Sequence, residues 1–177
     1  MHYRRTDITG GTYFFTVNLA ERHQRTLVNH IDLLRQTVHS VKQRHPFRID
    51  AIVVLPDHLH AVWTLPEGDA DYPKRWMLIK TGFSRLLPNR EQRCTSRKLK
   101  GERGIWQRRY WEHLIRDLDD FRSHIDYIHY NPVKHGYVKH AAEWPYSSIH
   151  RYIEQGILEG NWGSNVDPCC SGRYGEP

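Results

Sequence analysis

The strongest constraint on the fold is a pair of strand-like runs separated by a tight turn. The first run, Phe47–Leu55, ends in an almost continuous apolar stretch, and the second, His58–Leu65, alternates between apolar and polar residues. Both patterns are typical of β-strands. Pro56-Asp57 between them is a turn signal. We therefore predict that the two runs pair as an antiparallel hairpin.

The remaining elements follow from hydrophobic spacing and from turn residues. The predicted order is a strand at 11–19, a helix at about 29–45, strands at 47–55 and 58–65, a helix at about 72–87, a strand at 111–116 and a helix at about 117–130, closed by Asn131-Pro132. Together with the hairpin, this order predicts an α+β fold with a ferredoxin-like antiparallel sheet and helices packed on one face. We expect one domain over residues 1–155 and a loosely ordered tail over 156–177.

Composition favours a DNA-binding protein over a membrane or secreted one. The net charge is +6, and aromatic residues, including six Trp and ten Tyr, make up 12% of the 177 residues. Excess positive charge suits a polyanion, and exposed aromatic rings stack on unpaired bases. No apolar run approaches the ~20 residues that a membrane span needs. With three cysteines and no C-x-x-C spacing, a reducing cytoplasm is the expected location.

Two histidines in the second strand of the hairpin suggest a metal site. Side chains alternate along a strand, so His58 and His60 project from one face and Leu59 from the other. Two imidazoles on one face can share a divalent cation. In a chain with 13 histidines, two surface side chains without a shared ligand are the alternative.

A second pair of polar residues lies near the end of the last predicted helix. Tyr127 and Asn131 are four residues apart and therefore share one helix face. The Asn131 carboxamide could supply an oxygen ligand for Mg²⁺ or Mn²⁺. The alternative is a Tyr127 that faces the core and an Asn131 that caps the helix before Pro132.

Taken together, these motifs resemble the HUH endonucleases and, more narrowly, the REP-associated tyrosine transposases, which are related to single-tyrosine insertion-sequence transposases. His58-Leu59-His60 matches the His-hydrophobe-His motif of the superfamily. The resemblance covers most of the chain through the segments 3–5, 10–19, 53–66, 105–113, 126–136 and 144–148. Their length makes the match specific, although residues 88–104 are longer than the family pattern and carry no correspondence.

The resemblance implies a role for each matching residue. His58 and His60 match the metal-binding pair, and Tyr127 matches the nucleophile of the Tyr-Ile-His-x-Asn-Pro motif. Asn131 takes the place of the third ligand, which is usually Gln in the insertion-sequence relatives, so a shorter side chain must reach the metal. Tyr130 and Tyr137 are rival nucleophiles, and Tyr130 points about 100° away from Asn131 around the helix.

By resemblance, the expected activity is metal-dependent cleavage and transfer of single-stranded DNA at repetitive extragenic palindrome (REP) hairpins. Attack by Tyr127 would leave a 5′-phosphotyrosine and a free 3′-hydroxyl, with Mg²⁺ or Mn²⁺ as cofactor. The alternatives are a non-catalytic DNA-hairpin-binding regulator and a hydrolase in which water attacks. We expect a monomer or homodimer. The expected DNA contacts are Arg4, Arg5, Arg108, Arg109, Lys134 and His135.

Overall fold

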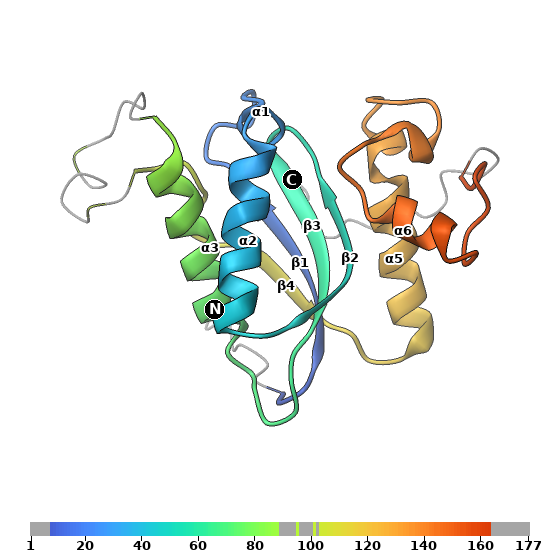
Figure 1. Ribbon diagram of the computed structural model, residues 1–177, viewed down its shortest axis with the longest axis horizontal. Coiled ribbons are helices and arrows are strands. Elements are labelled where there is room, and N and C mark those ends of the chain that lie inside the picture. The colour runs from blue at the N-terminus through green and yellow to red at the C-terminus, as the bar shows by residue number, and fades with distance from the viewer. Residues whose placement is uncertain (1–7, 89–94, 96–100, 102, 164–177) are drawn as a thin grey trace.

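The computed structural model describes residues 8–88, 95, 101 and 103–163 (Figure 1). Its strands are β1 (Thr12–Asn18), β2 (Arg48–Val54), β3 (His58–Thr64) and β4 (Trp111–Leu114). Its helices are α1 (Thr26–Asn29), α2 (Ile31–Arg44), α3 (Tyr72–Leu86), α5 (Leu118–Lys134), the 3₁₀ turn η1 (Ala141–Glu143) and α6 (Ile149–Glu154). Within these residues, no helix is both long and apolar enough to cross a membrane.

The described strands form one antiparallel sheet in the order β2-β3-β1-β4. The predicted hairpin is confirmed, because β2 pairs with β3 across the Pro56-Asp57 turn. With α2 and α3 as the connections, the chain order from β1 to β4 has the ferredoxin-like βαββαβ pattern. β1 and β3 lie in the middle of the sheet, where Thr16 is opposite His60 and Asn18 is opposite His58.

Helices cover both faces of the sheet. On one face, Leu59, Ala61 and Trp63 of β3 pack in a core with α2 and α3, where Trp63 stacks on Trp76 at 4.1 Å between ring centroids. On the other face, Val62 of β3 packs in a second core with α5. Figure 1 shows α2 and α3 on one side of the sheet and α5 with α6 on the other. The antiparallel α+β fold is therefore confirmed, and α5 adds a layer on the face opposite α2 and α3.

The last long helix does not close at Asn131-Pro132, as the sequence had suggested, but runs on to Lys134. Pro132 lacks an N–H, which usually ends a helix. Here the turn that follows supplies donors to the carbonyls of Asn131 and Pro132: His135 N–H donates to Asn131 O at 3.0 Å, and Tyr137 N–H donates to Pro132 O at 2.9 Å. Gly136 then ends the helix with φ of 69°. Asn131 is therefore a fully buried residue within α5 and not its cap.

Helices α2 and α3 approach closely at Gly82, which leads to a prediction about stability. A Cβ at this position would lie 2.8 Å from Thr37 Cγ2, and a 2.8 Å bond from Thr37 Oγ1 to Leu33 O fixes that side chain. Alanine favours a helix by about 1 kcal/mol over glycine, but overpacking costs about 1–3 kcal/mol. We expect Gly82→Ala to lower the free energy of unfolding, measured by urea denaturation, by about 1 kcal/mol net.

The double variant Gly82→Ala/Thr37→Ser provides the control, because serine lacks the methyl group that the new Cβ would meet. It should be more stable than Thr37→Ser alone. A stabilising Gly82→Ala in both backgrounds would show that the helices are not in close contact at this point.

Candidate active site

The two histidines of β3 project from the face of the sheet that α5 covers. His58 and His60 are 1% and 0% exposed, and Leu59 between them is buried in the opposite core. The predicted alternation is therefore confirmed. Because both imidazoles are buried, their nitrogens must be engaged by protein groups or by a ligand.

The Nδ1 atom of each imidazole faces a polar partner on the sheet. His58 Nδ1 lies 2.7 Å from Asp57 Oδ1, and His60 Nδ1 lies 2.8 Å from Thr16 Oγ1. An ionised carboxylate accepts hydrogen bonds only, so Asp57 favours the His58 tautomer with the proton on Nδ1. Thr16 can accept from His60 in the same way. In this tautomer the free lone pair is on Nε2, which is then the atom able to bind a metal. This is the usual arrangement of metal-ligating histidines.

Two neighbouring side chains stabilise the ionised form of Asp57. Burial alone would raise the pKa of this carboxyl group, but hydrogen bonds from His58 and Arg22 and the positive charge of Arg22 outweigh burial and lower its pKa from 3.8 to about 2. Arg22 Nε donates to Asp57 Oδ2, on the side away from His58. Asp57 is therefore ionised at neutral pH and holds the His58 ring in place.

The relative orientation of the two rings suits a shared ion. Their centroids are 5.0 Å apart and their planes are inclined by 86°. An imidazole lone pair lies in the plane of its ring, so one ion can be bound by two rings only where their planes meet. Perpendicular neighbouring rings satisfy this condition.

Helix α5 brings a stripe of three side chains against these histidines. The Tyr127 ring lies 5.2 Å from the His60 ring, and the His135 ring lies 5.3 Å from the His58 ring. Asn131 is midway between Tyr127 and His135 in the sequence, and residues four apart share a helix face. Asn131 is therefore on the helix face that carries Tyr127, and its side chain is fully buried.

The hydroxyl of Tyr127 has a charged neighbour. Lys134 Nζ donates a hydrogen bond to Tyr127 Oη at 3.2 Å and lies 4.8 Å from the centre of the ring. Tyr127 is only 3% exposed, whereas Lys134 and His135 are exposed. Lys134, the last residue of α5, and His135, which follows it, are therefore solvent-exposed neighbours of the buried site.

The rival tyrosines are less suited to attack a group held by the histidines. Tyr137 stacks on Trp144 at 5.3 Å, and burial together with the negative charge of Asp57 raises the pKa of its phenol. Tyr130 borders Gly163, where a Cβ would lie 3.5 Å from the Tyr130 ring. Among the ring contacts of the described residues, Tyr127 is the tyrosine in contact with His60.

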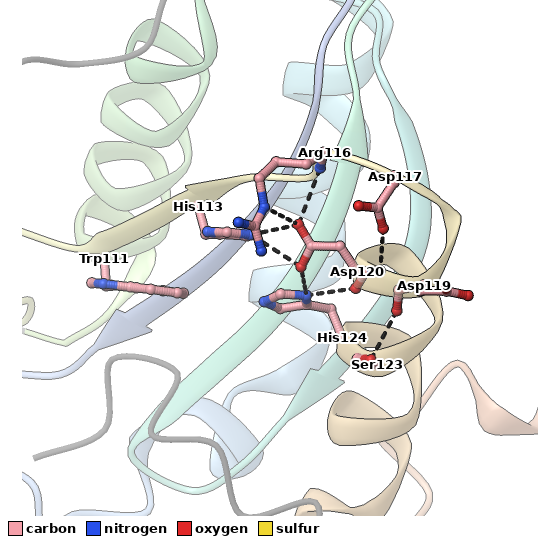
Figure 2. Close-up of a pocket in the computed structure, with 8 residues that line it drawn as sticks. All are labelled: Trp111, His113, Arg116, Asp117, Asp119, Asp120, Ser123 and His124. Carbon is pink, nitrogen blue, oxygen red and sulfur yellow. Dashed lines mark hydrogen bonds and ion pairs between the residues drawn. The ribbon is translucent and has the colours of Figure 1, made fainter.

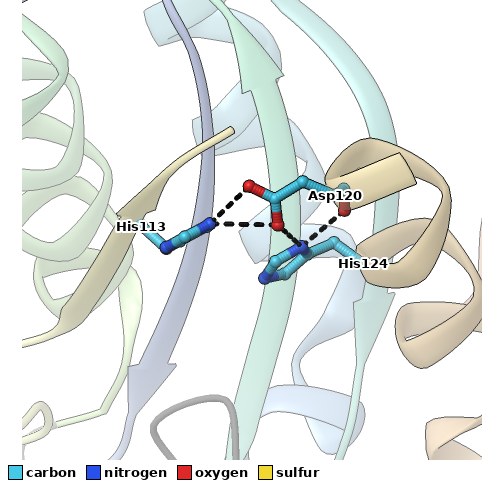
Figure 3. Close-up of side chains that lie close together, drawn as sticks. All are labelled: His113, Asp120 and His124. Atoms are coloured by element: carbon cyan, nitrogen blue, oxygen red, sulfur yellow. Dashed lines mark hydrogen bonds and ion pairs between the residues drawn. The ribbon is translucent and has the colours of Figure 1, made fainter. Parts of the chain in front are cut away.

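A second histidine group lies beside this site, at the start of α5 (Figures 2 and 3). His113, Asp120 and His124 form the one group of three or more His, Cys, Asp and Glu side chains in the described chain that could hold a metal ion, with ligand atoms within 4.8 Å of one another. They line an open pocket of about 590 Å³. Figure 3 shows the Asp120 carboxylate between the two imidazoles.

In the present arrangement, this second group is a hydrogen-bonded network. Asp120 Oδ2 accepts from His113 Nε2 at 2.8 Å and from Arg116 Nε at 3.1 Å, and His124 Nδ1 lies 2.7 Å from Asp120 O. The two imidazoles are stacked, at 4.8 Å and 18°. The ligand atoms lie close enough together to hold an ion, but here His113 Nε2 and Asp120 Oδ2 are hydrogen-bonded to each other. The ring of Phe14 lies between the two groups, 5.6 Å from His60 and 4.7 Å from His124.

The other predicted DNA contacts are not gathered at this site by any contact between described residues. Arg108 and Arg109 are exposed in the segment that leads into β4, where Lys80 Nζ donates to Arg108 O at 3.3 Å. Arg4 and Arg5 lie outside the described residues, as do most of the basic segment 88–104 and the tail beyond residue 163.

Sequence reasoning missed the partners that orient the histidines. Thr16 is 44 residues from His60 in the chain, so only the register of β1 against β3 reveals their contact. Asp57 was interpreted as a turn residue. The signal that could have identified it is its position directly before His58, where an acceptor can reach Nδ1.

Comparisons with known proteins agree with this architecture. No protein-family model that was compared with the chain matches it. The chain is 44% identical over 171 residues to the REP-associated tyrosine transposase of Escherichia coli K12, which covers 97% of this chain and 96% of the relative. It is 46% identical over 167 residues to a Haemophilus influenzae protein named "Putative REP-associated tyrosine transposase". This match covers 94% of this chain and 95% of the relative.

A solved structure is also similar. It is a REP-associated tyrosine transposase bound to a REP hairpin, with a TM-score of 0.84 and 43% identity, covering 100% of this chain and 98% of that one. Near-complete coverage at this identity leaves no part of the described fold unmatched. The chain belongs to the REP-associated tyrosine transposases.

Proposed function

We propose that this chain is a metal-dependent single-strand DNA endonuclease and strand-transfer enzyme that acts on REP hairpins through a 5′-phosphotyrosine at Tyr127. The REP hairpin bound to the structural relative supports the choice of substrate. The observation that carries the mechanism is the contact of the Tyr127 ring with His60, on the side of the sheet where both β3 histidines project.

Tyr127 is suited to attack a phosphorus atom held beside the histidines. Its oxygen would form a bond to phosphorus while the bond from phosphorus to the 3′-oxygen breaks, and that oxygen leaves as a 3′-hydroxyl. One phosphodiester replaces another, so the linkage keeps the energy needed for a second 3′-hydroxyl to reverse the step. This chemistry requires no nucleotide triphosphate.

The residues around Tyr127 fit a divalent ion. His58, His60 and Asn131 would supply two nitrogens and one oxygen, a mixed set that suits Mn²⁺ or Mg²⁺. The ion would polarise a non-bridging phosphate oxygen and hold the scissile group in line. Asp57 and Thr16 would fix the tautomers and ring orientations of the two histidines.

The site must open for DNA to enter. His58, His60, Tyr127 and Asn131 are at most 3% exposed. The exposed Lys134 and His135 are therefore the side chains that a phosphate from solvent would meet first. Arg108 and Arg109 would bind phosphates of the flanking strand.

The first test is formation of a covalent adduct. A 3′-labelled REP hairpin oligonucleotide with single-stranded flanks would be incubated with the protein and Mn²⁺, then separated on a denaturing gel. We expect a slow, protease-sensitive labelled band with wild type and none with Tyr127→Phe, because phenylalanine lacks the attacking oxygen. Tyr130→Phe is the matched control and should retain the band.

Tight hairpin binding without any adduct would instead favour the DNA-binding regulator. A cleaved but unattached product, still formed by Tyr127→Phe, would favour attack by water.

The second test distinguishes the two histidine groups. We expect His58→Ala and His60→Ala to weaken Mn²⁺ binding, measured by calorimetry, by at least about tenfold, because each removes a proposed ligand. EDTA should abolish the adduct, and added Mn²⁺ should restore it. His113→Ala should leave the affinity within about threefold, as expected if that ring acts through hydrogen bonds. The reverse pattern would assign the ion to His113, Asp120 and His124.

The third test concerns the phosphate contacts. If Arg108 and Arg109 each neutralise one phosphate, then Arg108→Ala and Arg109→Ala should each reduce the slope of log affinity against log salt by about one. Arg35→Ala is the control, since it removes the same charge from α2 on the opposite face of the sheet. If all three variants have the same slope of log affinity against log salt, Arg108 and Arg109 make no phosphate contact.

A further inference from the structure

We propose that Lys134 is a catalytic residue whose ammonium group binds the Tyr127 phenolic oxygen and stabilises negative charge on it during both cleavage and rejoining. This role rests on the proposed function of Tyr127 as nucleophile. It goes beyond the phosphate contact that the basic character of Lys134 suggests, because it places the lysine on a reacting atom.

The ammonium group of Lys134 reaches the phenolic oxygen. Lys134 Nζ donates a hydrogen bond to Tyr127 Oη at 3.2 Å and also lies over the ring, 4.8 Å from its centroid. The two residues are seven apart on α5, two turns of the helix, and lie on the same side. This pairing exists only because α5 continues past Pro132 to Lys134.

The surroundings make this ammonium suited to the role. Tyr127 is 3% exposed, and its ring contacts are with Phe14 and with His60. A phenolate oxygen in such a place is poorly solvated and depends on a nearby donor. An ammonium has three donors, so Lys134 can keep the bond to Tyr127 while it binds a phosphate oxygen with another.

The charge on the phenolic oxygen changes in both directions of the reaction. In cleavage, Tyr127 Oη loses its proton to solvent and forms the bond to phosphorus, while the 3′-oxygen departs and takes up a proton. In rejoining, an incoming 3′-hydroxyl loses its proton and attacks phosphorus. The electron pair of the broken bond then returns to Tyr127 Oη. A hydrogen bond from a cation lowers the energy of this oxygen in both transition states.

The experiment separates this role from phosphate binding. Adduct formation would be measured in single turnovers at saturating REP hairpin with Mn²⁺, together with hairpin affinity, for wild type, Lys134→Gln, Lys134→Arg and Lys139→Gln. Lys139 is also exposed and lies beyond the end of α5, so its substitution removes the same charge without touching Tyr127.

We expect Lys134→Gln to slow adduct formation at saturating hairpin by about ten- to a hundredfold. The loss should be smaller than for removal of a fully buried donor, because Lys134 is exposed. Lys134→Arg should recover part of the rate, and Lys139→Gln should stay within about twofold of wild type. A Lys134→Gln variant that binds hairpin more weakly but reaches the wild-type rate at saturation would overturn the proposal. Equal losses in Lys134→Gln and Lys139→Gln would overturn it too, since they indicate a net-charge effect.

A second readout is independent of activity. With ¹³Cζ-labelled tyrosine, the Tyr127 resonance, assigned by its loss in Tyr127→Phe, should move in Lys134→Gln and stay in place in Lys139→Gln. An unchanged resonance in Lys134→Gln would show that the contact is missing. If wild type forms no adduct while this shift is present, the proposed function fails, and the catalytic role of Lys134 with it, although the contact itself stands.

Discussion

The placement of the whole site depends on the alternation of side chains along β3. This strand lies between β1 and β2, and its apolar side chains pack in a core on each face of the sheet. A slip of one residue would turn His58 and His60 toward α2 and α3 and would bring Leu59 to the site. Burial of Trp63 against Trp76 resists that slip, since an indole ring cannot be exchanged for a small polar group without large loss of contact. The core on one face thus fixes the chemistry on the other.

Helix α5 supplies the other half of the site, and interactions at its two ends fix its position. At its start, Asp117 accepts from Asp120 N–H at 2.8 Å, and Asp120 is bonded to His113 of β4. Burial would raise the pKa of Asp120, but hydrogen bonds from His113 and Arg116 lower it to about 2, so the carboxylate remains charged at neutral pH. This network ties the helix to the sheet about two turns before Tyr127. At its end, the turn after Pro132 brings Lys134 and His135 over the site.

Local pattern was enough to predict the strands, the hairpin and the common face of His58 and His60, because each depends on residues close in sequence. The spacing of Tyr127 and Asn131 likewise predicted a shared helix face. The end of α5 was predicted wrongly, since the rule that proline stops a helix ignores the backbone donors that follow Pro132. The face of the sheet that α5 covers and the contact of Thr16 with His60 could not be predicted. Both depend on pairing between distant segments, which hydrophobic periodicity does not encode.

The two histidine groups show how the same residue types are held in two different ring arrangements. Both contain two imidazoles within 5.0 Å of each other, and both have a carboxylate beside a ring nitrogen. In the β3 pair, the polar partners lie at the Nδ1 atoms and the ring planes are nearly perpendicular. In the second group, the Asp120 carboxylate lies beside a nitrogen of each imidazole, and the two rings are stacked. On the proposed function, the first pair would hold the ion beside Tyr127, whereas the second group hydrogen-bonds β4 to the start of the helix that carries Tyr127.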